Sequence, residues 1–176
     1  SQVAHGEAPK DMGIILSSYG HAIAIRHDLV PGEGNSYMRE VAEHATVPVY
    51  NLQCDIDHPF QALADLMTIR EEFGKNLKGR KIVVSWAYAP SYAKPMSVPQ
   101  GLITLMPRFG LDVVLAHPPE WKLMKAPMAF AQSEAKKHGT TFEVIGDMDE
   151  ACRGADIIYA KSWGIEELFH KPQEAL

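Results

Sequence analysis

The chain has few cysteines, no long hydrophobic run and no basic cluster. It has only two cysteines in 176 residues, Cys54 and Cys152, which excludes a fold held by several disulfides and favours a reducing cytoplasm. No apolar run approaches the roughly 20 residues that span a membrane, and SQVAHGEAPK at the start lacks a signal peptide's apolar core. The net charge of -5 and the scattered basic residues argue against a nucleic-acid partner.

The apolar residues follow two alternating patterns. Short β-rich runs, apolar on both faces, are typical of buried parallel strands. They lie at residues 22–26, 47–51, 81–86, 112–117, 141–145 and 156–160. Helical spacing occurs at residues 10–19, 35–45, 59–73, 98–109, 125–138 and 147–153. This repeated order predicts an α/β fold with parallel sheets.

A polar connection divides this series in two. The helix expected at residues 59–73 is the longest, and GKNLKGRK follows it before residues 81–86 begin a new series. We therefore expect two lobes, each with a parallel β-sheet flanked by helices, joined by the long helix. They comprise residues 1–76 and 77–176. Gly110 and Gly139 fall just past two helices, where a C-terminal cap favours glycine.

The start of the long helix carries the first candidate site. Pro59 suits the first helical turn, which leaves Asp57 or His58 as the N-cap. Gln61 follows His58 by three residues, so both can face the same side of that turn. The free N–H groups of a helix N-terminus suit an anionic ligand. On spacing alone, however, a structural cap is the simpler interpretation, because Xaa-Pro opens many helices.

The residues around His58 resemble a known family. HPFQALADLMTI is similar to the His-Pro-x-Gln motif and following Leu-x-Asp-Leu-x-Thr-Ile helix of the aspartate and ornithine carbamoyltransferases. HGEAPKDMGIILSSYGHAIAIRH, LKGRKIVVSW, FGLDVVLAHPPEW and DEACRGADIIYAKSW resemble other family stretches in the same order. SWAYAPSYAKPMSVPQG resembles the proline-rich loop of the knotted carbamoyltransferase subgroup, particularly a less characterised branch near purine-catabolic enzymes.

The resemblance implies an enzyme that moves the carbamoyl group of carbamoyl phosphate to the amino group of an amino acid or related small amine. Phosphate is released, and no metal or organic cofactor is expected. Residues 1–76 would form part of the carbamoyl-phosphate-binding domain, including the connecting helix. Residues 77–176 would form part of the domain for the second substrate. A cytoplasmic homotrimer with shared sites is expected, without nucleic-acid or membrane partners.

Site roles also follow from the resemblance. His58 would donate to the carbonyl oxygen on which negative charge builds, and Gln61 would bind the carbamoyl NH2 group through its amide oxygen. Arg26 would hold carbonyl and phosphate oxygens; without the resemblance, a surface salt bridge is the simpler interpretation. Ser1 and His5 match a loop that reaches a neighbouring subunit's site in the family, with a frayed terminus as the alternative.

Choice of the amine is expected in SWAYAPSYAKPMSVPQG. Aspartate-type relatives place an arginine here and ornithine-type relatives an asparagine, and this chain has neither. The available recognition groups are Trp86, Tyr92 and Lys94. Lys94 suits an amino-acid carboxylate, although a solvated lysine on a turn fits equally well. The identity of the amine stays open.

Two family motifs do not occur. The Ser-x-Arg-Thr-Arg phosphate loop is expected before residue 1 and the His-Cys-Leu-Pro segment after residue 163. We therefore expect the central part of a longer enzyme, inactive by itself and with exposed apolar sheet edges. The alternative is a non-catalytic assembly or regulatory module with this fold. A nucleotide-dependent α/β enzyme is disfavoured, because no Gly-x-Gly-x-x-Gly or Walker loop follows any strand.

Overall fold

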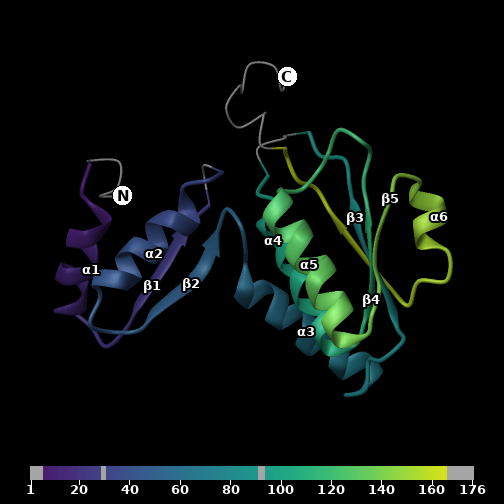
Figure 1. Cartoon of the computed structure of the whole chain (residues 1–176), viewed down its shortest axis with the longest axis horizontal. Coiled ribbons are helices and arrows are strands. Elements are labelled where there is room, and N and C mark those ends of the chain that lie inside the picture. Colours follow the sequence, from purple (N-terminus) through teal and green to yellow (C-terminus); the bar gives the residue numbers. More distant parts are fainter. Residues whose placement is uncertain (1–5, 29–30, 91–93, 166–176) are drawn as a thin grey trace.

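The computed structural model describes residues 6–28, 31–90 and 94–165, which form two parallel β-sheets joined by a long helix (Figure 1). In the first sheet β1 (Ile23–His27) pairs with β2 (Val49–Cys54). The second sheet has the order β5-β4-β3-β6. Its strands are β3 (Lys81–Trp86), β4 (Asp112–Ala116), β5 (Phe142–Ile145) and β6 (Ile157–Lys161). All pairings are parallel, which confirms the predicted α/β fold.

Helices flank both sheets. In the first lobe these are α1 (Pro9–Ser17) and α2 (Gly34–His44), and α3 (Pro59–Phe73) leads into the second lobe. The second lobe adds α4 (Ser97–Leu105), the 3₁₀ turn η2 (Met106–Phe109), α5 (Lys125–His138) and α6 (Met148–Cys152). Figure 1 shows α4 and α5 on one side of the second sheet and α6 on the other.

One predicted strand was displaced along the chain. The run at residues 47–51 was predicted as a strand, but β2 runs from Val49 to Cys54. Pro48 has no N–H to add to a ladder, whereas Gln53 and Cys54 pair with Arg26 and His27. The strand therefore extends to the loop that contains His58.

One predicted helix divides at a proline. The segment 98–109 forms α4 and then η2, because Pro107 cannot donate a helical hydrogen bond and the chain tightens into a 3₁₀ turn. Gly110 ends η2 with φ 92°, and Gly139 ends α5 with φ 68°. Both predicted glycine caps are confirmed, since positive φ is a conformation that glycine adopts without steric cost.

The second lobe has a core on each face of its sheet. Toward α4 and α5, Ile82 and Val84 of β3 pack with Leu102 of α4 in one large cluster. Toward α6, Val83 packs in a smaller cluster with Ala151. Successive β3 side chains thus enter opposite cores, as expected for a sheet buried on both sides.

The connecting helix belongs physically to the second core. Leu66 and Ile69 of α3 are buried in the cluster that contains β3 and α4. A boundary between residues 76 and 77, with α3 assigned to the first lobe, stays a prediction. In the structure α3 attaches to the second lobe by apolar packing.

The first lobe has less buried apolar surface. Its buried hydrophobic residues are Ile23, Met38, Val41 and Cys54. Gly13 lets α1 approach α2 closely, because a Cβ there would lie 2.5 Å from the carbonyl oxygen of Val41.

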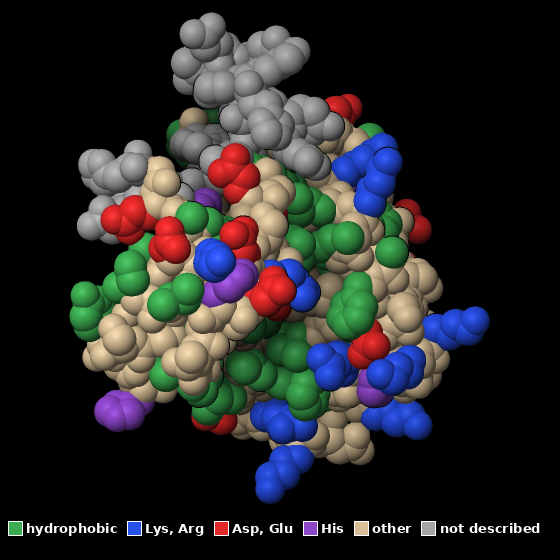
Figure 2. Space-filling view, turned by 60° about the vertical axis from the view of Figure 1, so that its left-hand side comes forward, with side chains coloured by type: hydrophobic (Ala, Val, Ile, Leu, Met, Phe, Trp, Pro, Cys, Tyr) green, Lys and Arg blue, Asp and Glu red, His purple; other side chains and the backbone are tan. Residues whose placement is uncertain are grey.

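Large hydrophobic side chains remain exposed along β2 and α3. They are Tyr50, Leu52, Phe60, Leu63 and Met67. Figure 2 shows hydrophobic side chains reaching the surface among charged ones on the face turned toward the viewer. None of the helices that the structure describes has the length and apolar character needed to cross a membrane.

Candidate active site

His58 is the N-cap of α3, with Pro59 in the first turn. Its Nδ1 accepts a hydrogen bond from the backbone N–H of Gln61 at 3.4 Å, so the neutral ring carries its proton on Nε2. Burial first, and then the charge of Arg26, lower the pKa of His58. The lowered pKa favours the neutral ring, in which Nε2–H is the hydrogen-bond donor.

Asp65 fixes the orientation of the Gln61 amide. The Gln61 Nε2 donates to Asp65 Oδ1 at 3.0 Å, which leaves the amide oxygen of Gln61 as an acceptor. Asp65 lies one turn further along α3. The pKa of Tyr159 on β6 is raised to about 12, mainly by burial and in addition by the charge of Asp65. Asp65 thus links Gln61 electrostatically to the second sheet.

Arg26 lies near the end of β1, just after a shift in strand register between Ile25 and Arg26. Its Nε and Nη2 donate to the two carboxylate oxygens of Asp28 at 3.2 and 3.1 Å. The Arg26 side chain is 61% exposed and that of Asp28 is 11% exposed. Because a guanidinium has five N–H donors, three have no partner among the residues that the structure describes. The structure contains the salt bridge that was the simpler interpretation of Arg26.

Gln100 of α4 holds the loop that precedes His58. Its Nε2 donates to the carbonyl oxygens of Asp55 and Ile56 at 3.0 and 2.8 Å. Its Oε1 accepts from the N–H of Met124 at 3.1 Å. Gln100 is fully buried, so these bonds replace water for groups that would be costly to leave unpaired. One side chain thereby ties α4 to the first lobe and to the start of α5.

Two further contacts join the lobes beside His58. Gln53 Nε2 donates to Ser97 Oγ at 2.9 Å, and both residues are buried. Gly101 of α4 lies so close to the loop that a Cβ there would be 2.6 Å from Asp57 Oδ1. Burial raises the pKa of Asp57, opposed by a backbone hydrogen bond at His58. The His58 loop is therefore positioned by α4.

Three tryptophans contact one another at the carboxyl end of the second sheet. The rings of Trp86 and Trp121 stack with centroids 4.8 Å apart. Trp86 Nε1 donates to the Trp163 carbonyl at 3.1 Å, and Trp163 Nε1 donates to the Trp121 carbonyl at 2.9 Å. The N–H of Trp86, a predicted recognition residue, is thus used within the protein. Its half-buried ring is the part available to a ligand.

Lys161 is a candidate that the sequence reasoning missed. It ends β6 and pairs in register with Trp86. Burial first, and then the charge of Lys94, lower the pKa of Lys161. The Lys94 carbonyl accepts from Gly164 N–H at 2.9 Å, which anchors the Lys94 backbone beside the end of β6. Its position in DIIYAKSW was the available signal, since α/β sheets bind ligands beyond the carboxyl ends of their strands.

The structure gives two groups of candidate residues. Arg26, His58 and Gln61 interact around the start of α3, and Lys94 with Lys161 lies at the carboxyl end of the second sheet. Predicted site residues Ser1, His5 and Tyr92 lie outside the described residues. Within residues 6–28, 31–90 and 94–165, no three His, Cys, Asp or Glu side chains gather as a metal ion would require.

Two family models match this chain. Residues 1–71 match the carbamoyl-P binding domain of aspartate/ornithine carbamoyltransferase, and residues 94–174 match the Asp/Orn binding domain. YgeW of Escherichia coli (strain K12), whose name marks it as a provisional carbamoyltransferase, is 46% identical over 189 residues, covering 100% of this chain and 48% of YgeW. N-acetylornithine carbamoyltransferase of Xylella fastidiosa (strain 9a5c) is 42% identical over 132 residues, covering 73% of this chain and 38% of that protein.

Solved structures agree with these matches. A mutant N-acetyl-L-ornithine transcarbamylase complexed with carbamyl phosphate and N-succinyl-L-norvaline superposes with a TM-score of 0.85 and 31% identity. Acetylornithine transcarbamylase complexed with acetylcitrulline gives 0.84 and 30%. Each alignment covers 94% of this chain and 52% of the solved chain. The chain therefore spans about half the length of the relatives it matches.

Proposed function

The chain belongs to the aspartate/ornithine carbamoyltransferase family, and from this premise we propose that the full-length protein transfers the carbamoyl group of carbamoyl phosphate to the amino group of a small amino acid or related amine. Matches to both domain models support the proposal. The geometry of His58 is the single observation that supports the proposed reaction. Its Nδ1 is occupied by the backbone N–H of Gln61, and Nε2–H is left to donate.

The reaction needs a donor aimed at one oxygen. The nitrogen lone pair of the amine attacks the carbamoyl carbon, and electrons move onto the carbonyl oxygen. As the carbonyl re-forms, the C–O bond to phosphate breaks and phosphate leaves with that electron pair. The attacking nitrogen loses one proton to phosphate or solvent. His58 Nε2–H stabilises the charged oxygen without transferring its proton, which is oxyanion stabilisation.

Gln61 and Arg26 complete the proposed carbamoyl phosphate contacts. Because the Gln61 NH2 group is held by Asp65, the Gln61 amide oxygen is free to accept from the carbamoyl NH2 group. Arg26 offers its remaining donors to the phosphate and carbonyl oxygens. The carboxylate of Asp28 competes with phosphate for Arg26, so Asp28 also limits how strongly the guanidinium holds the released product.

The second substrate is proposed to carry a carboxylate. Lys94 and Lys161 repel one another electrostatically, and Lys161 is partly buried, an arrangement that an anion between them would stabilise. The half-buried Trp86 ring is proposed to pack against the body of the amine. A related solved enzyme holds acetylcitrulline, itself a carboxylate. Tyr92, which lies in the same segment as Trp86 and Lys94, is proposed as a further contact with the amine.

The proposed assembly is a cytoplasmic homotrimer. Ser1 and His5 are proposed to reach the site of a neighbouring subunit. Residues 1–176 alone are expected to turn over little, because a dianionic phosphate needs more aligned donors than Arg26 and one helix start provide.

Phosphate release tests the activity. The purified full-length protein, given carbamoyl phosphate and a panel of amino acids and small amines, should release phosphate together with a carbamoylated amine detected by mass spectrometry. The matched rate without amine corrects for spontaneous decomposition. Absence of amine-dependent release across the panel would contradict the proposed reaction.

A further inference from the structure

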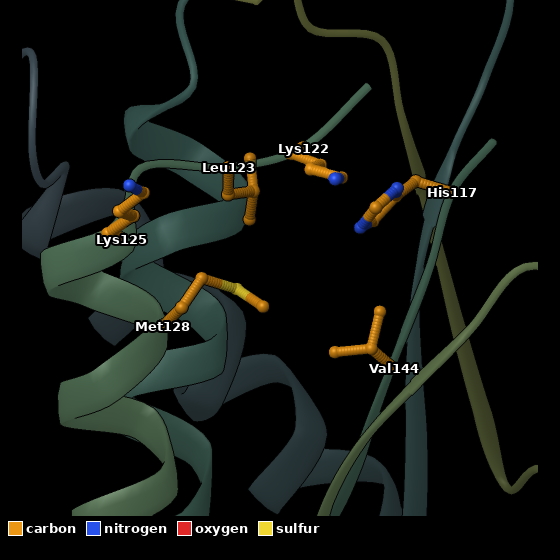
Figure 3. A pocket seen from close by; sticks show the side chains of 6 residues that line it. All are labelled: His117, Lys122, Leu123, Lys125, Met128 and Val144. Atoms are coloured by element: carbon orange, nitrogen blue, oxygen red, sulfur yellow. The ribbon is translucent and has the colours of Figure 1, made fainter. Parts of the chain in front are cut away.

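A cavity of about 360 Å³ lies in the second lobe, beside the start of α5. None of the proposed carbamoyltransferase residues lines it. Its lining residues are His117, Lys122, Leu123, Lys125, Met128 and Val144. In Figure 3, Leu123 and Met128 lie opposite His117 and Val144, and the Lys122 amine points toward the His117 ring. The Lys125 amine is turned away from that ring. The size lies at the lower end of the range for ligand pockets, which suits a small molecule.

His117 presents an unused acceptor in this cavity. The residue is 6% exposed, and its Nδ1 lies 2.7 Å from the carbonyl oxygen of Pro118. A carbonyl oxygen only accepts, so Nδ1 carries the proton and the neutral ring has a lone pair on Nε2. Nε2 has no hydrogen-bond partner among the residues that the structure describes. A ligand with an O–H or N–H donor would satisfy it.

The other residues that line the cavity indicate the chemistry of the rest of the ligand. Leu123, Met128 and Val144 provide apolar surface, which suits an aliphatic body. Lys122 places a cation near His117, and the first turn of α5 has no side-chain cap, so its N–H groups add positive potential. A carboxylate next to the donor group matches this charge. A hydroxyl is the better donor for Nε2 than an ammonium, because the ammonium would lie beside Lys122.

Both walls are fixed within the protein. Leu123 and Lys125 flank Met124, whose N–H is bound by the buried Gln100. On the other side, Nδ1 of His117 is hydrogen-bonded to the Pro118 carbonyl oxygen. The His117 ring packs edge-on against the Trp163 ring, with the ring centroids 6.4 Å apart. A site whose walls are already ordered loses less entropy when a ligand binds.

We propose that this cavity binds a small aliphatic 2-hydroxy acid. Its hydroxyl donates to His117 Nε2, its carboxylate pairs with Lys122, and its alkyl group packs on Leu123, Met128 and Val144. The cavity is thus a second ligand site in the lobe, separate from the proposed carbamoyl-transfer residues.

Titration calorimetry on the full-length protein tests this site with 2-hydroxy-4-methylpentanoate. We expect saturable binding with a Kd below about 1 mM. The corresponding amide lacks the negative charge and should bind at least about tenfold more weakly, the scale of one charge-assisted hydrogen bond. 4-Methylpentanoate lacks the hydroxyl and should bind about fivefold more weakly. Equal affinities for the acid and its amide, or no saturable heat, would overturn the proposal.

Variants locate the binding. Val144→Trp fills the cavity and should abolish binding, and Lys122→Gln should weaken it about tenfold. Lys136→Gln, at the opposite end of α5, is the matched control and should leave the affinity unchanged. Met128→Trp serves as a second filling variant if Val144→Trp fails to fold by circular dichroism. Unchanged affinity in a folded filling variant and in Lys122→Gln would place the ligand elsewhere and overturn the proposal.

Discussion

The two lobes differ in what holds their chemistry in place. The second lobe has a four-stranded sheet with a core on each face. Among the residues that the structure describes, the first has two strands and few buried hydrophobic residues, yet it supplies Arg26 and, at the junction with the second lobe, His58. Gln100 from α4 bonds directly to the loop before His58. The first lobe thus carries proposed transfer residues whose position depends on polar contacts with the second.

Truncation of an apolar side chain should cost much more in the second core than at the exposed side chains of β2. Leu102→Ala removes a fully buried side chain from the second core and should lower the free energy of unfolding by about 2–5 kcal/mol. Leu52→Ala in β2 removes a side chain that is 38% exposed and should lower it by under about 1 kcal/mol. Urea denaturation followed by circular dichroism measures both. Equal losses would show that the Leu52 side chain is packed as tightly as that of Leu102, contrary to its exposure.

Removal of His58 should affect catalysis more than folding. In the full-length enzyme, His58→Ala should reduce kcat by about a hundredfold or more, the usual scale for loss of one oxyanion donor. The melting temperature should fall only slightly, because one N-cap hydrogen bond of α3 is lost. His21→Ala is the matched control, because His21 is exposed, and it should retain the parent rate. A His58→Ala enzyme with near-parent kcat would remove His58 from the proposed reaction.

Loss of Gln100 should disturb the contact between the lobes. Gln100→Ala leaves two carbonyl oxygens and the Met124 N–H without this partner, at a cost of about 1–3 kcal/mol. Backbone NMR shifts should change at residues 55–58. Gln132→Ala, on the exposed surface of α5, is the control. It should change the free energy of unfolding by no more than about 0.5 kcal/mol. Shifts at residues 55–58 that match those of the control would contradict the contact.

Of these changes, protonation of His58 should have the smallest effect on stability and activity. Its folded pKa is below the usual 6.5, so the unfolded chain binds more protons as pH falls below 6.5. The contribution of neutral His58 to stability is therefore present above pH 6.5 and is lost as pH falls through the folded pKa. Activity should fall over the same acidic range, because protonated His58 no longer accepts the Gln61 N–H.

Neighbouring charges allow a check of that titration by proton NMR. Arg26→Gln removes a positive charge that lowers the pKa of His58, and should raise this pKa. Asp28→Asn removes a negative charge that raises it, and should lower the pKa further. His58→Gln identifies the signal. Shifts in the opposite directions would show that Arg26 and Asp28 do not control His58 electrostatically.

Local sequence patterns predicted the fold well. Residues 59–73, 81–86 and 125–138 have the predicted bounds, because proline starts, glycine ends and apolar runs act within a few residues. The displacement of β2 depended on pairing with β1, and the packing of α3 depended on a core formed by distant segments. Neither is determined by a local pattern.

The candidate site was predicted only in part. His58 and Gln61 share a helix start that is visible in the sequence, and the structure adds the hydrogen bond between them. Lys161 and Gln100 were missed, since their neighbours Lys94 and Asp55 lie 67 and 45 residues away along the chain. Chain folding alone brings such side chains together.

Steady-state kinetics with both substrates varied tests the central claim, that the two lobes bind different substrates. In the full-length enzyme, Arg26→Gln should raise the KM for carbamoyl phosphate about tenfold or more and leave the KM for the amine nearly unchanged, because it removes one charged contact. Lys161→Gln should do the reverse. The same change in both KM values for each variant, or an exchange of the two effects, would contradict this division between the lobes.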